Sequence, residues 1–347
     1  MKYALLGRTG LSVSRLSLGA MTFGAGTQLG AAKNDMDQAA ADKIVGRAIE
    51  AGINLFDTAN TYGLGESERM LGRALGAKRR EAVIVTKAGF RMSGRLENGL
   101  SYRNIIQSAE DSLQRLCTDW IDLFLLHRHD ALAPYEETAR ALERLVQDGK
   151  IRYTGICNHQ AWQIERFLGI AREKGWRPMT VAQMYYSLVG RDLEQDCLEF
   201  FQDTGMGVMV WSPLAGGFLS GKYKRETMTS ADGRWINFKM PPVDLELGFQ
   251  VVEALERMAK PRDATVAQLS LAWLLARPWI STVIVGASRI EQLDQNLGAL
   301  DIVLTVEELA ELDALTKQNA RYPNPRWLSD NALEDVRNAA TGKGKRS

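Results

Sequence analysis

The sequence lacks the features that mark membrane proteins and proteins that bind polyanions. No stretch approaches the roughly 20 apolar residues of a membrane span, and the N-terminal segment MKYALLGRTGLSVSRLSLG has no continuous apolar core. The 43 Lys and Arg residues are balanced by 42 Asp and Glu residues, which leaves no strong electrostatic field. We therefore expect no membrane partner and no nucleic-acid partner.

Cysteine and histidine are both scarce. Cys117, Cys157 and Cys197 lie far apart without a C-x-x-C pair, a pattern typical of free thiols in a reducing compartment. We therefore expect a cytoplasmic protein. The histidines number only three. A metal-dependent barrel hydrolase using Asp57 and His127 would need further His and carboxylate ligands at strand ends, and the sequence does not offer them. No metal is expected.

A G-x-G-x-x-G motif at the start of an early helix is also missing, which counts against a Rossmann dinucleotide-binding fold. What the chain does contain is 45% hydrophobic residues over a length of 347, enough to bury a large core. We expect one domain over residues 1–347, with a disordered tail, TGKGKRS, at 341–347.

Short apolar runs alternate with helical patterns along the chain. The predicted strands are 16–21, 54–56, 82–87, 121–127, 151–157, 180–184, 207–211 and 282–286. The predicted helices that follow them are 37–51, 67–75, 101–116, 134–147, 161–174, 194–204, 247–258 and 290–300. Because the strands are apolar throughout and never joined by two-residue turns, they are expected to pair in parallel. Eight such units favour the α/β class and a closed (β/α)8 TIM barrel over an open sheet.

Three further segments lie outside this repeat. Residues 3–6 and 11–16, separated by GRTG, predict an N-terminal β-hairpin that serves as a plug or lid. Helices over 265–276 and 305–317 are expected as C-terminal additions to the barrel. The long loop 218–247 has no role that its sequence assigns.

Polar residues stand where successive strands end. Asp57, Lys87 and His127 end the second, third and fourth predicted strands, and Tyr62 lies in the loop after the second. In a parallel barrel these four side chains converge at one mouth. A lysine can lower the pKa of a nearby phenol from ~10, a carboxylate can hold that lysine in place, and a histidine can polarise a substrate oxygen.

Each of these residues has an ordinary structural interpretation as well. Asp57 could cap a helix or serve a loop, and Lys87 could extend from a strand end into solvent. His127 could be satisfied by backbone groups, and Tyr62, beside Gly63, could be loop packing. Their joint placement at successive strand ends favours the chemical interpretation.

Several segments together resemble the aldo-keto reductase superfamily, in particular its bacterial members and the beta subunits of voltage-gated potassium channels. They are TGLSVSRLSLGAMTFG, FDTANTYGLGESERMLG, VIVTK, DLFLLH, VMVWSPLAGGFLSGKY and VIVGASRIEQLDQN, in the expected order between about Lys2 and Leu315. The resemblance implies a (β/α)8 barrel that binds a nicotinamide cofactor across its mouth without a metal. The catalytic tetrad of the family falls on Asp57, Tyr62, Lys87 and His127. Channel beta subunits carry Asn at the position of His127, so this chain is grouped with the catalytic reductases.

The resemblance also implies a set of cofactor contacts. Asn158 and Gln183 are expected to bind the nicotinamide carboxamide, and Trp211 to stack on its ring. The remaining expected contacts, with Asp57 shared, are Met21, Ser212, Leu214, Gly216, Gly217, Lys222, Gly286, Ser288, Arg289, Gln292, Gln295 and Asn296. Ser288 and Arg289 near a helix N-terminus suit a 2′-phosphate, which favours NADP(H) over NAD(H).

Two residues depart from the pattern of the family. Cys157 stands where Ser usually precedes Asn158, and a thiol is the weaker hydrogen-bond donor. We therefore expect one amide contact to be softened or supplied by another group. Gln295 stands where Glu commonly contacts the adenine amino group, and the lost charge predicts a slight change in cofactor affinity.

The resulting functional prediction is NADPH-dependent reduction of an aldehyde or ketone, with Tyr62 as proton donor. The alternative is a cofactor-sensing regulatory subunit with little turnover. The substrate pocket has two interpretations, an aromatic one lined by Phe23, Phe90, Trp235, Tyr322 and Trp327, and an anion-selective one. The residues of the second are Arg91, Arg95 and Arg128. The sequence does not choose between these two pockets. It also does not determine the substrate, the reaction direction or the oligomeric state.

Overall fold

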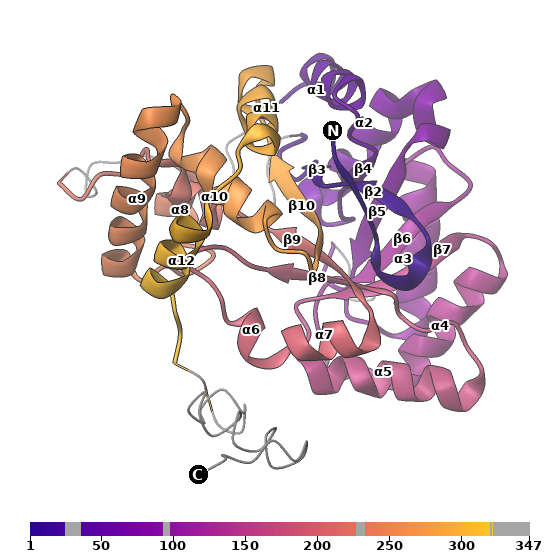
Figure 1. Ribbon diagram of the computed structural model, residues 1–347. Helices are drawn as coiled ribbons and strands as arrows, with labels where there is room; N and C mark the ends of the chain where they lie inside the picture. The colour runs from indigo at the N-terminus through magenta and orange to yellow at the C-terminus, as the bar shows by residue number, and fades with distance from the viewer. Residues whose placement is uncertain (25–35, 93–97, 227–232, 320, 322–347) are drawn as a thin grey trace, which may run out of the picture.

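The chain folds into a closed barrel of eight parallel strands with helices around it (Figure 1). The computed structural model describes residues 1–24, 36–92, 98–226, 233–319 and 321. Among the helices of these residues, none is both long enough and apolar enough to cross a membrane. The predicted (β/α)8 fold is confirmed.

The barrel strands follow one another around the ring in chain order, and the last strand closes the ring against the first. They are β3 (Leu16–Gly19), β4 (Leu55–Asp57), β5 (Val83–Ala88), β6 (Ile121–Leu126), β7 (Ile151–Cys157), β8 (Val181–Tyr185), β9 (Gly207–Trp211) and β10 (Ile280–Gly286). The closing pair aligns Val285 of β10 with Leu18 of β3. All eight strands therefore end at the same mouth, as the position of the predicted site requires.

The helices form an outer layer. They are α1 (Gln38–Glu50), α2 (Glu66–Leu75), α3 (Tyr102–Arg115), α4 (Tyr135–Gln147), α5 (Ala161–Lys174), α6 (Leu193–Asp196), α7 (Leu198–Thr204), α8 (Arg234–Phe238), α9 (Leu245–Ala259), α10 (Val266–Leu275), α11 (Ile290–Leu297) and α12 (Val306–Leu315). Figure 1 shows α3, α4 and α5 on one side of the barrel and α8, α9, α10 and α12 gathered on the other. Asp37, Ser101 and Thr265 cap helix N-termini with their side chains.

Burial divides the apolar residues into two cores. Residues that alternate inward along the strands, such as Leu55, Val85, Leu123 and Met209, fill the inside of the barrel. The alternate residues, such as Phe56 and Phe124, pack outward against the helices in the larger core. The strands are thus buried on both faces, which explains why they read as continuous apolar runs.

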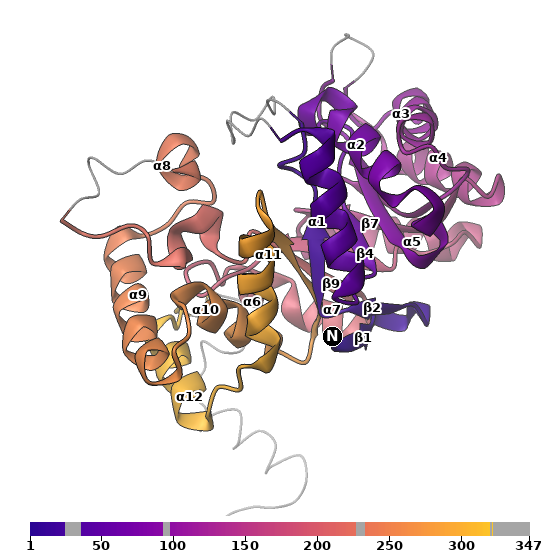
Figure 2. The ribbon, with the colours of Figure 1, turned by 90° about the horizontal axis from the view of Figure 1, so that it is seen from above.

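The predicted hairpin is present and plugs the barrel at the end opposite the mouth. β1 (Tyr3–Leu5) pairs antiparallel with β2 (Ser12–Ser14). Leu6 and Val13, beside these strands, are fully buried and belong to the inner core. Figure 2 shows the hairpin at one end of the barrel and α8 toward the other. The hairpin is therefore a plug and not a lid over the mouth.

The helix that fills the barrel position between β9 and β10 is not the one expected. The sequence assigned residues 247–258 to this position and 265–276 to an addition, but α10 packs against β10 and α9 packs on α10. The sequence VAQLSLAWLL makes α10 apolar on nearly all sides, as a helix covered by both a sheet and another helix must be. The predicted order of these two helices is wrong.

Two smaller expectations also fail. The helix predicted over 194–204 is two short helices, α6 and α7, which meet at Cys197. Ser67, the first residue of the helix predicted over 67–75, lies inside α2, whose N-cap is Gly65. Its hydroxyl is buried and donates to the carbonyl of Ala20, so it ties α2 to the end of β3.

Candidate functional site

Three adjacent strands place the polar residues of the predicted tetrad side by side. β4, β5 and β6 are neighbours in the barrel, with Asp57 aligned to Val85 and Lys87 aligned to Leu125. His127 follows β6 directly, and its backbone N–H donates to the carbonyl of Ala88 at 2.8 Å. The strand ends therefore bring all three side chains to one sector of the mouth.

Tyr62 reaches the same sector through a tight turn. It opens a short 3-10 segment, Tyr62–Gly65, in which Gly63, Leu64 and Gly65 all have positive φ. Such a backbone favours glycine, and Leu64 is the strained member of the three. The turn folds the Tyr62 ring back, so that its centroid lies 5.1 Å from Lys87 Nζ and 5.8 Å from the His127 ring.

The charged centre of the site is a buried ion pair. Lys87 Nζ donates to Asp57 Oδ1 at 2.7 Å and to the carbonyl oxygen of Thr58 at 2.8 Å. The other carboxylate oxygen, Oδ2, accepts from the side-chain amide of Gln183 at 2.6 Å. The Lys87 side chain is 0% exposed. Removing a lone ammonium from water is costly. The buried Lys87 ammonium is stable here because Asp57 and the Thr58 carbonyl are hydrogen-bonded to it.

The pKa values of this pair and of Tyr62 respond to opposing influences. Burial by itself lowers the pKa of Lys87, but the negative charge of Asp57 outweighs burial and raises it, which keeps the ammonium charged. The pKa of Tyr62 is also raised, chiefly by burial, while Lys87 acts to lower it. The lysine thus acts in the expected direction on the phenol, but without reversing the effect of burial.

His127 is a neutral imidazole near neutral pH. Burial, with the positive charges of Lys87 and Arg128, holds its pKa well below the usual 6.5. Its Nδ1 atom is buried and has no hydrogen-bond partner among the described residues. Phe90 packs edge-on against the ring with centroids 4.7 Å apart. The sequence left open the interpretation that backbone groups satisfy the His127 ring. For Nδ1 that interpretation does not hold.

A second group of expected residues lies across the mouth from Lys87. Asn158 follows β7 with a positive φ of 58°, and its side-chain oxygen accepts from Trp211 Nε1 at 2.9 Å. Trp211 ends β9 half-buried, and its ring lies 5.3 Å from that of Tyr185. This hydrogen bond fixes a flat aromatic surface beside an exposed amide, the arrangement expected for a nicotinamide site.

Cys157 supports the same amide group. Its sulfur accepts from Asn158 Nδ2 at 3.1 Å, and its thiol lies 3.8 Å from Gln183 Oε1 as a donor. Burial raises the pKa of the thiol to about 12, so the group stays protonated. The departure from Ser therefore leaves a weak hydrogen-bonding link between the two amides expected to bind the cofactor.

The glycine-rich loop after β9 turns tightly through left-handed backbone. Ser212, Gly216 and Gly217 all have positive φ, and the Ser212 hydroxyl accepts from the Gly216 N–H at 2.9 Å. Leu214 precedes the 3-10 segment Ala215–Ser220. Lys222 is exposed, and a Cβ at Gly217 would meet only its ammonium end, at 3.7 Å. The Gly217 backbone is thus open to an approaching group.

The segment after β10 leads into α11, whose N-cap is Arg289. Gly286 and Arg289 are exposed, and a Cβ at Gly286 would meet nothing within 4 Å. Gln292 accepts through Oε1 from both the backbone N–H and the hydroxyl of Ser288, each at 2.9 Å. Asn296 is buried and donates to the Gly286 carbonyl at 3.5 Å.

Gln295 and Met21 are the two remaining residues of the expected cofactor set. Gln295 is exposed, and its backbone carbonyl accepts from Gln268. Met21 is half-buried just after β3. Apart from Asp57, the expected cofactor residues thus lie at or after the ends of β3, β7, β8, β9 and β10, five strands that are neighbours around the ring.

The sequence missed contacts that involve the backbone. The Thr58 carbonyl binds Lys87, but a carbonyl has no sequence signature. Of the proposed pocket aromatics, Phe23 and Trp235 are core residues, and Trp235 packs against Phe218. Phe90 does lie at the site. Tyr322, Trp327, Arg95 and the expected tail 341–347 lie outside the described residues.

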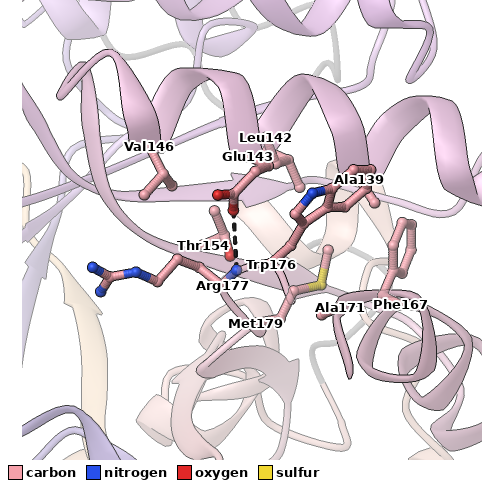
Figure 3. A pocket seen from close by; sticks show the side chains of 10 residues that line it. All are labelled: Ala139, Leu142, Glu143, Val146, Thr154, Phe167, Ala171, Trp176, Arg177 and Met179. Atoms are coloured by element: carbon pink, nitrogen blue, oxygen red, sulfur yellow. Dashed lines mark hydrogen bonds between the residues drawn. The ribbon is translucent and has the colours of Figure 1, made fainter. Parts of the chain in front are cut away.

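Two cavities of the described chain lie elsewhere. Figure 3 shows one of about 20 Å³ between α4 and α5, where Glu143 accepts from the backbone N–H of Arg177 at 3.0 Å. The other, of about 170 Å³, lies between the hairpin and α10. Among the residues that the structure describes, no group of three or more His, Cys, Asp or Glu is placed to hold a metal ion.

Comparison with known proteins agrees with the barrel fold. The family model described as "Aldo/keto reductase family" matches residues 15–317. A putative voltage-gated potassium channel subunit beta of Schizosaccharomyces pombe is 37% identical over 332 residues, 90% of this chain and 92% of its own length. The uncharacterized oxidoreductase YrpG of Bacillus subtilis is 34% identical, covering 94% and 97%. An L-glyceraldehyde 3-phosphate reductase of Escherichia coli K12 is 34% identical, covering 90% and 92%. The family match and the oxidoreductases among the relatives support an oxidoreductase, and the chain belongs to the aldo/keto reductase family.

Proposed function

We propose that this protein is an NADP(H)-dependent oxidoreductase that reduces an aldehyde or ketone to an alcohol. The observation that carries the proposal is the buried Lys87–Asp57 ion pair beneath the Tyr62 ring, with neutral His127 beside it at the barrel mouth. No structural role requires a lysine with no exposed surface at this point, because a buried ion pair is not by itself a source of stability.

The residues across the mouth fit a nicotinamide dinucleotide. Trp211 offers a ring face, and Asn158 retains donor capacity, because Cys157 takes only one of its two amide hydrogens. The open backbone at Gly217 and Gly286 can approach phosphates closely. When bound, such a cofactor supplies the hydride.

The proton that accompanies the hydride comes from the protein. The raised pKa of Tyr62 keeps its hydroxyl protonated near neutral pH, so the group is a proton donor to a carbonyl oxygen on which charge develops. Lys87, held by Asp57, places a fixed positive charge beside the phenolate that remains. His127, neutral because of its lowered pKa, orients the carbonyl with a hydrogen bond.

Preference for the 2′-phosphate of NADP(H) over NAD(H) is proposed from Arg289. Its guanidinium is exposed at the start of α11, close to Ser288, and guanidinium pairs strongly with phosphate. The helix N-terminus adds a favourable partial charge.

The first experiment follows the loss of NADPH absorbance with a panel of aldehydes and ketones. Tyr62→Phe is expected to lower kcat by two or more orders of magnitude, because general acid catalysis contributes about 10²–10⁴-fold. Cofactor affinity, measured by quenching of tryptophan fluorescence, is expected to stay within about threefold. Tyr153→Phe is the matched control, because Tyr153 bonds the Thr9 carbonyl at the plugged end. Equal turnover of Tyr62→Phe and wild type would contradict the assigned role.

A second candidate is a cofactor-sensing regulatory subunit, which the channel-subunit names among the relatives favour. The same measurements separate the two functions. The proposed enzyme turns over NADPH with a carbonyl substrate and keeps its activity in the presence of a chelator. A sensing subunit binds NADPH but leaves its absorbance unchanged with every carbonyl compound.

A further inference from the structure

Arg128 stands at the mouth of the barrel in a stack of side chains that leads directly to the catalytic sector. Its guanidinium carbon lies 4.7 Å from the centroid of the Phe90 ring. The Phe90 ring in turn lies 4.7 Å from the ring of His127, which contacts Tyr62. The positive charge is thus two ring contacts from the imidazole that would orient a substrate carbonyl.

The Arg128 charge is not neutralised within the described chain. The side chain is exposed, and its Nε donates one long hydrogen bond, of 3.4 Å, to the carbonyl of Gly89. In the described ranges no carboxylate lies within ion-pair distance of the guanidinium. The nearest acidic residue in sequence, Asp130, is engaged by the backbone N–H groups of Leu100 and Leu132. The two terminal nitrogens of Arg128 are therefore left to bind an anion.

The position of Arg128 favours an anionic group of the substrate over the phosphates of the cofactor. Arg128 follows β6, and β7 and β8 separate it on one side from β9, while β3, β4 and β5 separate it on the other from β10. The loops expected to hold the cofactor phosphates follow β9 and β10. Arg128 is thus across the barrel from those phosphates and next to the place of the reacting carbonyl.

Resting on the function proposed above, we propose that Arg128 forms a subsite for the anionic group of the substrate, so that the preferred substrates are short aldehydes or ketones carrying a carboxylate or phosphate. The planar guanidinium supplies paired N–H donors that match both groups. Phe90 holds the guanidinium in place by stacking and also packs against His127, which fixes the charge relative to the reaction centre.

The test compares an acid with its neutral ester of the same chain, succinic semialdehyde against its methyl ester, with NADPH. Wild type is expected to prefer the acid by at least tenfold in kcat/KM, mostly through KM. Arg128→Gln is expected to lower the acid-to-ester ratio by about 10- to 100-fold, as for a lost hydrogen bond to a charged group. Arg128→Lys should restore part of the ratio, and added salt should lower it in wild type.

Arg140→Gln is the matched control, because Arg140 is an exposed arginine of α4 that stacks on Tyr102 of α3 in the outer helix layer. It is expected to leave both rates unchanged. Glyceraldehyde 3-phosphate against glyceraldehyde then distinguishes phosphate from carboxylate as the better anion. An unchanged acid-to-ester ratio in Arg128→Gln would overturn the subsite while leaving the reductase intact. If wild type reduces neither compound nor any other carbonyl, the proposed function fails, and the subsite fails with it.

Discussion

At the scale of single residues, buried titratable groups show how burial and neighbours set protonation. Lys87 remains charged with no exposed surface because Asp57, Thr58 and Gln183 complete a hydrogen-bonded group around the pair. His127 and His159 are buried without a carboxylate beside them, and burial lowers the pKa of both. The pKa of the lysine is raised because its charged form has a carboxylate partner, and the pKa values of the two histidines are lowered because their charged forms have none.

His159 gives a prediction for the pH dependence of stability. Its pKa is lowered to about 4, mainly by burial, against 6.5 in the unfolded chain. Between these values the unfolded state binds more protons, so the free energy of unfolding falls as the pH drops through this window. Nδ1 of His159 lies 2.9 Å from the carbonyl oxygen of Cys157. The side-chain amide of an asparagine at position 159 can donate to the same oxygen.

Between pH 7.5 and about 4, we expect the free energy of unfolding of the wild type to fall by about 2–3 kcal/mol more than that of His159→Asn. The size follows from the pKa difference of His159 between the folded and unfolded states. Urea unfolding followed by circular dichroism at several pH values measures this. Parallel curves for the two proteins would show that another group governs the loss in acid.

At the scale of elements, the sequence predicts what local pattern determines. β7 and β9 were predicted to the residue, because turn residues bound each of them and β9 is apolar after its first glycine. The exchange of α9 and α10 was not predicted, since both read as helices and only packing decides which one touches the barrel. For the site, strand ends drew attention to Asp57, Lys87 and His127, and the loop after the second strand to Tyr62. The turn that positions Tyr62 and the Phe90 contact depend on tertiary structure. The catalytic and cofactor roles themselves stay predictions.

Two helical glycines illustrate how packing overrides propensity. A Cβ at Gly72 in α2 would lie 2.5 Å from the backbone oxygen of Leu116, whereas one at Gly46 in α1 meets nothing within 4 Å. Gly46→Ala is expected to stabilise the protein by about 0.5–1 kcal/mol through helix propensity. Gly72→Ala is expected to destabilise it by about 1–3 kcal/mol, because a backbone atom cannot yield cheaply. Thermal unfolding of both variants measures the difference, and stabilisation of both would refute the close contact.

At the scale of the whole molecule, the barrel depends on its plug. Leu6 is 0% exposed and continues the inner core, whereas its neighbour Leu5 is 61% exposed. Leu6→Ala is expected to cost about 2–5 kcal/mol, as for other fully buried leucines, and Leu5→Ala less than about 0.5 kcal/mol. Urea midpoints of the two variants test this. Equal midpoints would mean that the hairpin contributes no core.

The hairpin closes one end of the barrel, and the candidate site lies at the other. Met1 is exposed beside the hairpin, at the end of the barrel opposite the strand termini that carry Lys87 and Trp211. A surface linkage or fused carrier attached through the first residue would therefore orient the protein with its reactive opening toward the solution. Immobilised in that way, the protein should admit small molecules as freely as it does in free suspension.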